Sequence, residues 1–86
     1  MGDYKVEVKA TAAKELAGLD RSTATRILRS LEKLPSDPRP RQSKKLSGSK
    51  NSYRLRVGDY RVLYQIDVRL KRITIFAIGH RRDVYR

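Results

Sequence analysis

The sequence SYRLRVGDYRVLYQ, residues 52–65, decides the fold, because it has the pattern of a β-hairpin. Two runs of alternating residues flank Gly58-Asp59, and a glycine in the first central position suits a two-residue type II′ turn. With Val57 and Tyr60 on either side of that turn, Arg56 lies opposite Arg61. The stretch therefore predicts two antiparallel strands in a defined register.

This register divides the side chains of the hairpin between two faces, since successive residues of a strand point to opposite sides. One face is apolar and holds Tyr53, Leu55, Val57, Tyr60, Val62 and Tyr64. The other face holds Arg54, Arg56 and Arg61. Like charges directly opposite each other on a sheet are destabilising, so a purely structural role for the arginines is hard to justify. We expect them to bind an anion.

The residues before the hairpin predict a strand and a first helix. Residues 4–8 alternate apolar and charged side chains, which is typical of a half-buried strand. Thr11 is expected to cap a helix that ends at Gly18 and Leu19. The residues expected on the apolar face of this helix are Ala13, Leu16 and Ala17.

A second helix is predicted after a cap at Asp20 or Ser22, and residues 35–38, PSDP, end it. Its apolar residues recur at helical spacing and are Ala24, Ile27, Leu28, Leu31 and Leu34. Residues 35–51 are then expected to form a loop or extended connection. Its basic side chains, interpreted as flexible phosphate contacts or as a solvated loop, are Arg39, Arg41, Lys44, Lys45 and Lys50.

After the hairpin, residues 67–71 form a charged turn and residues 72–78, RITIFAI, are apolar at nearly every position. Such a run predicts a central strand buried on both faces, which Gly79 ends. The predicted order is β-α-α-β-β-β. We expect an α+β fold in which two N-terminal helices pack on one face of a small, largely antiparallel four-stranded sheet. Residues 1–86 are expected to form a single domain.

The positive charge of the chain is concentrated in its second half. Residues 1–38 carry a net charge of +1, whereas residues 39–86 carry +11. This asymmetry indicates a polyanion that meets the C-terminal half, although a basic surface that serves solubility is the alternative.

The composition also argues against several classes of site. The chain has no cysteine and one histidine, His80, which argues against disulfides, thiolate nucleophiles and a transition-metal site. No apolar run approaches the roughly 20 residues of a membrane span, and no signal peptide is recognisable. We expect a cytoplasmic protein without a cofactor or a membrane partner.

The C-terminal tail, if it folds back over the hairpin, would bring Arg81 and Tyr85 to the three arginines. Such a set suits RNA cleavage by the substrate's own 2′-hydroxyl, which requires an aligned phosphate, stabilisation of developing charge, and proton transfer. Arginine stabilises charge well but transfers protons poorly. His80 and Tyr85 are the nearby side chains that could transfer protons, although each also has a purely structural interpretation.

The combination of LSGSKNSYRLRVGDYRVLYQI, residues 46–66, with IFAIGHRRDVYR, residues 75–86, resembles the RelE/ParE superfamily of bacterial and archaeal toxins, and the RelE branch in particular. The resemblance covers nearly the whole chain and implies a metal-independent endoribonuclease that cuts mRNA in the ribosomal decoding site. It also implies a RelB-like antitoxin as partner, and a toxin–antitoxin complex that binds its own operator DNA.

The resemblance also implies roles for individual residues. Arg54 and Arg56 fall beside the scissile phosphate, Arg61 and Arg81 at transition-state-stabilising positions, and Tyr85 at the position of a general base or stacking platform. The predicted catalytic residues are thus Arg54, Arg56, Arg61, Arg81 and Tyr85. The predicted RNA-binding residues are Lys44, Lys45, Lys50, His80 and Arg82.

Two departures from the RelE pattern concern proton transfer. Arg54 and Arg56 stand where that pattern has lysines, and the tail is about two residues shorter between Arg81 and Tyr85. Two other functions therefore stay open. One is a ParE-type toxin that inhibits DNA gyrase, and the other is a catalytically inactive RNA-binding relic.

Overall fold

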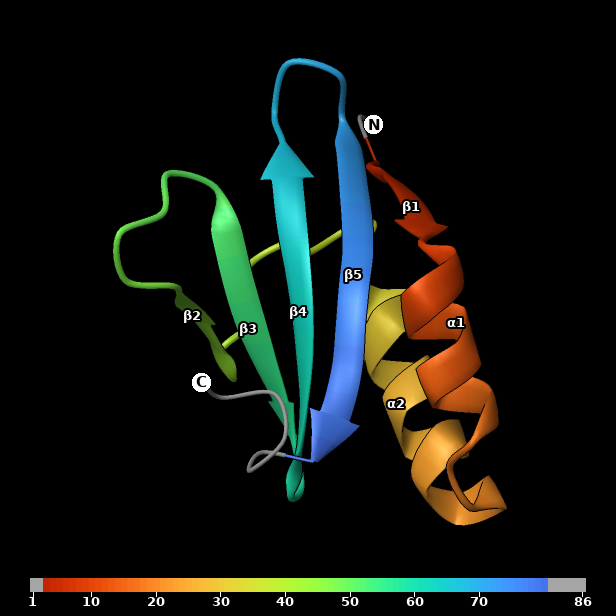
Figure 1. Cartoon of the computed structure of the whole chain (residues 1–86). Coiled ribbons are helices and arrows are strands. Elements are labelled where there is room, and N and C mark those ends of the chain that lie inside the picture. The colour runs from red at the N-terminus through yellow and green to blue at the C-terminus, as the bar shows by residue number, and fades with distance from the viewer. Residues whose placement is uncertain (1–2, 81–86) are drawn as a thin grey trace.

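The computed structural model describes residues 3–80, which form two helices and a five-stranded sheet (Figure 1). The elements are β1 (Lys5–Val8), α1 (Ala10–Ala17), α2 (Arg21–Lys33), β2 (Ser43–Lys45), β3 (Ser52–Val57), β4 (Tyr60–Asp67) and β5 (Arg72–His80). The strand order is β1-β5-β4-β3-β2, with β1 parallel to β5 and every other pair antiparallel. The predicted α+β class and mostly antiparallel sheet are confirmed.

The sheet has one strand more than predicted, because β2 forms within the segment that was expected to be a loop or extended connection. β2 is a three-residue edge strand that pairs with β3, so that Lys44 lies opposite Arg54. Its sequence, SKK, has no apolar alternation, and only the pairing with β3 makes it a strand. The prediction of four strands was therefore wrong by this one edge strand.

The hairpin of β3 and β4 has the predicted register, with Val57 opposite Tyr60 and Arg56 opposite Arg61. Gly58 has φ +60°, as the first central residue of a type II′ turn requires. A Cβ atom at Gly58 would lie only 3.0 Å from a guanidinium nitrogen of Arg26. The positive φ of the turn is therefore what requires glycine, since the guanidinium lies at the far end of a flexible side chain and can move aside.

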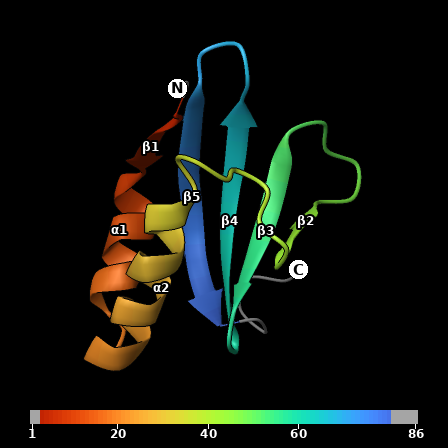
Figure 2. The same ribbon diagram turned by 180° about the vertical axis from the view of Figure 1, so that it is seen from behind.

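The two helices lie on one side of the sheet, which we call the helix face; the opposite side is the outer face. Figure 2 shows α1 and α2 side by side, next to β5. The carboxylate of Asp20 accepts a hydrogen bond from the backbone N–H of Thr23 at 3.2 Å, so Asp20 caps α2. The expected cap at Thr11 was wrong, because α1 begins at Ala10 without a side-chain cap.

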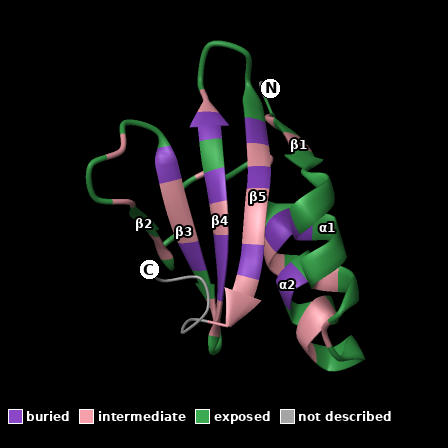
Figure 3. Ribbon diagram, viewed as in Figure 1, coloured by how far each residue is buried: buried purple, intermediate pink, exposed green. Residues whose placement is uncertain are grey.

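The core lies between the helices and the helix face. Figure 3 shows the buried residues, in purple, on β3, β4, β5 and the helices. The buried members of the core are Ala12, Ile27, Leu31, Leu34, Leu55, Val62, Tyr64, Ile66, Ile73, Ile75 and Ile78. In α1, Ala12 is buried, and Ala13 and Ala17 are exposed, contrary to prediction. In α2, Leu28 is 45% exposed and does not belong to the buried stripe.

β5 is buried on one face only, contrary to prediction, because both helices lie on the same side of the sheet. A β-bulge shifts its register: Tyr64 lies opposite Ile75, but Leu63 lies opposite Ala77, so that Phe76 has no partner in β4. The bulge reverses the faces of all later residues of β5. His80 therefore lies opposite Tyr60, on the helix face, and Gly79 lies opposite Arg61.

Neither helix in the described part of the chain is long and apolar enough to cross a bilayer.

Candidate functional site

Four arginines, one lysine and one glutamine line a pocket of about 300 Å³. The lining residues are Arg41, Gln42, Lys44, Arg54, Arg56 and Arg61, and we call this site the arginine pocket. Three of them come from the β3–β4 hairpin, one from β2, and two from the segment just before β2. No carboxylate lines the pocket among residues 3–80. The pocket is therefore suited to a multiply charged anion.

Arg61 is the least accessible cation of the pocket, with only 8% of its surface exposed. It lies directly opposite Arg56, which is exposed and whose Nε donates a 3.4 Å hydrogen bond to the carbonyl of Gly58. A cation with little access to water attracts an anion more strongly than a solvated one, because the local dielectric constant is lower. Arg61 is thus a nearly buried positive charge in the lining of the arginine pocket.

The segment that carries Arg41 is held against the sheet by a buried tyrosine. Tyr64 is fully buried, and its hydroxyl donates a 2.7 Å hydrogen bond to the carbonyl of Pro38. Burial raises the pKa of Tyr64 above its ordinary value, so its hydroxyl remains a donor at neutral pH. The ring of Tyr53 stacks on that of Tyr64, with the ring centroids 5.8 Å apart. The Nε of Arg39 donates a 3.0 Å hydrogen bond to the hydroxyl of Tyr53.

Backbone hydrogen bonds also hold residues 40–43 in place next to the arginine pocket. The N–H of Arg56 donates to the carbonyl of Gln42 at 3.2 Å, and the N–H of Ser43 donates to the carbonyl of Pro40 at 2.9 Å. A free loop would have to lose conformational entropy when its cations bind a ligand. These contacts mean that the segment before β2 is already ordered where it enters the pocket.

The side chains of the arginine pocket suit charge stabilisation better than proton transfer. Arginine cannot be deprotonated in proteins, and the amide of glutamine does not titrate. Lys44 is the one side chain among the described lining residues that can release a proton. No group of three or more His, Cys, Asp or Glu residues within the described range is arranged to hold a metal ion.

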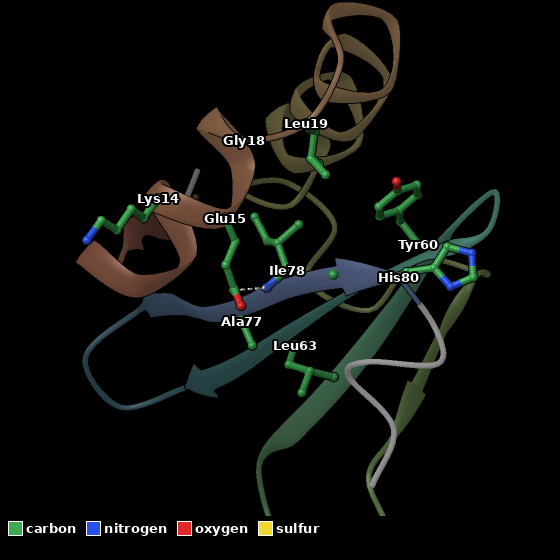
Figure 4. Close-up of a pocket in the computed structure, with 10 residues that line it drawn as sticks. Lys14, Glu15, Gly18, Leu19, Tyr60, Leu63, Ala77, Ile78 and His80 are labelled. Carbon is green, nitrogen blue, oxygen red and sulfur yellow. Dashed lines mark hydrogen bonds between the residues drawn. The ribbon is translucent and has the colours of Figure 1, made fainter.

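His80 lies at a different cavity, of about 490 Å³, between α1 and the ends of β4 and β5 (Figure 4). Its ring contacts that of Tyr60 edge-on, with the centroids 5.5 Å apart. Glu15 Oε1 accepts a 2.8 Å hydrogen bond from the backbone N–H of Ile78 at the same cavity. The cavity carries Lys14 and Glu15, which oppose each other in charge, and it has no cluster of cations. The structure thus does not bring His80 to the arginine pocket.

The other predicted residues divide into three groups. Arg54, Arg56, Arg61 and Lys44 meet in the arginine pocket. Lys45 and Lys50 are exposed and do not line it; Lys45 pairs with Tyr53, whose side chain belongs to the helix face. Arg81, Arg82 and Tyr85 lie outside the described residues.

Gln42 is a pocket residue that the sequence did not reveal, because a single glutamine beside basic residues has no distinctive pattern. Arg41 was expected only as a flexible phosphate contact. A short edge strand brings both to the hairpin.

Comparison with known proteins places the chain among toxins. Residues 6–85 match the family described as the ParE toxin of the type II toxin–antitoxin system, parDE. The chain is 30% identical to the putative toxin RelE1 of Methanocaldococcus jannaschii, over 96% of both chains. It is similar to the RelE–RelB complex from Pyrococcus horikoshii, with a TM-score of 0.82 and 32% identity over 92% of this chain and 96% of that one.

The isolated RelE toxin of Escherichia coli shares the fold, with a TM-score of 0.79 and 22% identity over 90% of this chain and 83% of that chain.

Proposed function

This chain belongs to the RelE/ParE superfamily of type II toxin–antitoxin toxins, and from that premise we propose that it is a ribosome-dependent endoribonuclease that cleaves mRNA in the decoding site. The observation that carries the proposal is the arginine pocket, in which five cations surround a space of about 300 Å³. The 30% identity to a putative RelE1 toxin supports the RelE branch.

In the proposed reaction, the 2′-hydroxyl of the substrate attacks the adjacent phosphorus, and the bond to the 5′-oxygen breaks. Negative charge grows on the non-bridging oxygens in the transition state, and fixed cations nearby lower its energy. Arg61 is buried and held on β4, so it would stabilise this charge with little rearrangement. Arg54 and Arg56 would fix the phosphate from the opposite strand.

The proposal also covers proton transfer and the partners of the protein. By resemblance, Tyr85 is the general base or stacking group and Arg81 a further phosphate ligand. The reaction would need no metal. The RelE–RelB complex from Pyrococcus horikoshii supports an antitoxin of the RelB type as the partner. We propose that the ribosome orients the mRNA, that the toxin–antitoxin complex binds its own operator, and that the toxin acts in the cytoplasm as a single domain.

The proposal is tested by supplying purified protein with mRNA in the presence and absence of ribosomes. Specific cleavage only when ribosomes are present is the expected result. Efficient cleavage of naked RNA would contradict ribosome dependence, and absence of cleavage in both reactions would support the inactive relic.

Inhibition of DNA gyrase is the second candidate. The matching family is described as the ParE toxin, and resemblance to ParE-type toxins implies gyrase inhibition. The two candidates differ in what the arginine pocket does, since gyrase inhibition requires no phosphodiester cleavage. Accumulation of gyrase–DNA breaks in growing cells, without loss of mRNA, would select the gyrase inhibitor.

A further inference from the structure

A second basic cavity lies between α2 and β3, on the other side of the sheet edge from the arginine pocket. It measures about 380 Å³, and we call it the α2 groove. Arg26, Arg29 and Lys33 of α2 line it. They follow one another at intervals of three and four residues, so they lie on one face of the helix. All three are exposed.

The α2 groove and the arginine pocket meet at the edge of β3. Gln42 and Arg56 line both cavities, and their backbones are joined by a 3.2 Å hydrogen bond. β2 pairs only with residues 53–55 of β3, so it ends before it reaches Arg56. The cations of α2 and those of the outer face therefore form one continuous basic path around this edge.

The lining of the α2 groove combines charge with an apolar floor. Leu55, which is 2% exposed, Val57 and Pro40 contribute the apolar part. No carboxylate lines the groove among the described residues. A nucleic-acid strand presents the complementary combination, with anionic phosphates along one side and apolar sugar and base surfaces beside them.

We propose that the α2 groove is a second RNA-binding site, which holds the backbone phosphates next to the scissile phosphate on the same substrate strand. This inference rests on the proposed endoribonuclease function, because it takes the strand in the arginine pocket to be RNA. The groove binds the backbone without reading the base sequence, since its cations contact phosphates. It would extend the footprint of the toxin beyond one phosphate.

The test compares two double variants that each remove two positive charges. Arg29→Gln/Lys33→Gln removes cations of the α2 groove from exposed helical positions. Lys5→Gln/Arg69→Gln removes exposed cations from β1 and from the β4–β5 turn. This turn lies at the end of the sheet opposite the β3–β4 turn (Figure 1). Thermal unfolding of both variants establishes that the fold is retained.

The probe is a single-stranded RNA oligonucleotide whose 2′-hydroxyls are methylated, so that it cannot be cleaved. Its affinity is measured by fluorescence anisotropy over a series of salt concentrations. For single strands each phosphate contact contributes about 0.7 to the salt slope, which corresponds to roughly fivefold in affinity per contact near 0.1 M salt. We expect Arg29→Gln/Lys33→Gln to lose about two such contacts, and the control to lose less than about twofold in affinity.

A dinucleotide of the same chemistry provides a length control, because it has a single internucleotide phosphate, and the proposal places that phosphate in the arginine pocket. Its affinity should be equal in the wild type and in Arg29→Gln/Lys33→Gln. The inference is overturned if the oligonucleotide binds the two double variants equally. It is also overturned if Arg29→Gln/Lys33→Gln affects only association with ribosomes, or only binding of poly-glutamate, since the groove would then serve ribosomal RNA or an acidic protein.

Failure of the inference is distinguishable from failure of the proposed function. The inference depends on how RNA affinity changes in the two double variants. The proposed function depends on ribosome-dependent cleavage by the wild type. Either measurement can contradict its expectation without changing the outcome of the other.

Discussion

Arg56 of β3 and Arg61 of β4 lie directly opposite each other across the hairpin, although both carry a positive charge. A like-charge pair at this position destabilises the sheet, whereas an opposite-charge pair would stabilise it. Arg61 is also nearly buried, which adds a desolvation cost. The pair therefore lowers the stability of the protein and concentrates positive charge in the arginine pocket.

Arg61→Ala should remove activity and leave the fold intact. The loss of one pre-positioned charge-stabilising group lowers the cleavage rate by roughly 10²–10³. Ribosome-dependent cleavage and growth arrest measure the activity, and thermal unfolding measures the fold. Arg69→Ala, which removes an exposed cation far from the pocket, is the control and should behave as the wild type. Undiminished growth arrest by Arg61→Ala would remove this residue from the site.

Arg56→Glu should stabilise the protein and inactivate it at the same time. The substitution converts a repulsive cross-strand pair into an attractive one, which is worth about 0.2–1 kcal/mol relative to a neutral pair. It also introduces a negative charge beside the scissile phosphate. The free energy of unfolding in denaturant should therefore rise while RNA affinity falls. A fall in stability would show that the repulsion between Arg56 and Arg61 is unimportant in the folded protein.

Lys44 can be tested for charge and proton transfer separately. Lys44→Ala should weaken binding of RNA, because a phosphate contact is lost. Lys44→Arg keeps the charge, so cleavage should be retained if Lys44 acts only as a phosphate contact, as we predict. The measurement is the single-turnover cleavage rate on saturated ribosomes. A large loss of rate in Lys44→Arg with unchanged affinity would instead assign proton transfer to this lysine.

Tyr64→Phe should loosen the segment that carries Arg41, because it removes the hydrogen bond to the carbonyl of Pro38. The expected loss of stability at neutral pH is about 1 kcal/mol, or more if the carbonyl stays buried without a partner. Tyr60→Phe, at a partly exposed tyrosine, is the control. Equal stability of Tyr64→Phe and the wild type would argue against this anchor.

The same tyrosine predicts how stability depends on alkaline pH. Burial raises the pKa of Tyr64 in the folded state above the value of about 10 that it has in the unfolded chain. The folded state therefore favours the protonated form. This contribution is fully present below about pH 10 and is lost as the pH rises through the folded-state pKa. The free energy of unfolding, measured in denaturant at a series of pH values above 10, should fall less steeply with pH for Tyr64→Phe than for the wild type.

The sequence by itself determined the hairpin and the arginines that it displays. Alternation in residues 52–65 assigns each side chain to a face, and Gly58 sets the register, because both depend on local backbone geometry. The placement of Arg56 opposite Arg61 needed no other part of the chain. The charge asymmetry also indicated a polyanionic ligand, and the resemblance over residues 46–66 and 75–86 implied that this ligand is RNA.

Only the tertiary structure decided which other residues join those arginines. β2 exists because β3 offers it an unpaired edge, and this pairing brings Lys44, with Arg41 and Gln42 before it, to the pocket. The bulge at Phe76 moves His80 to the helix face, away from Arg61. The α2 groove requires a helix and an edge of the sheet to meet. Each depends on hydrogen bonds or packing between separate segments of the chain, which the periodicity within one segment does not encode.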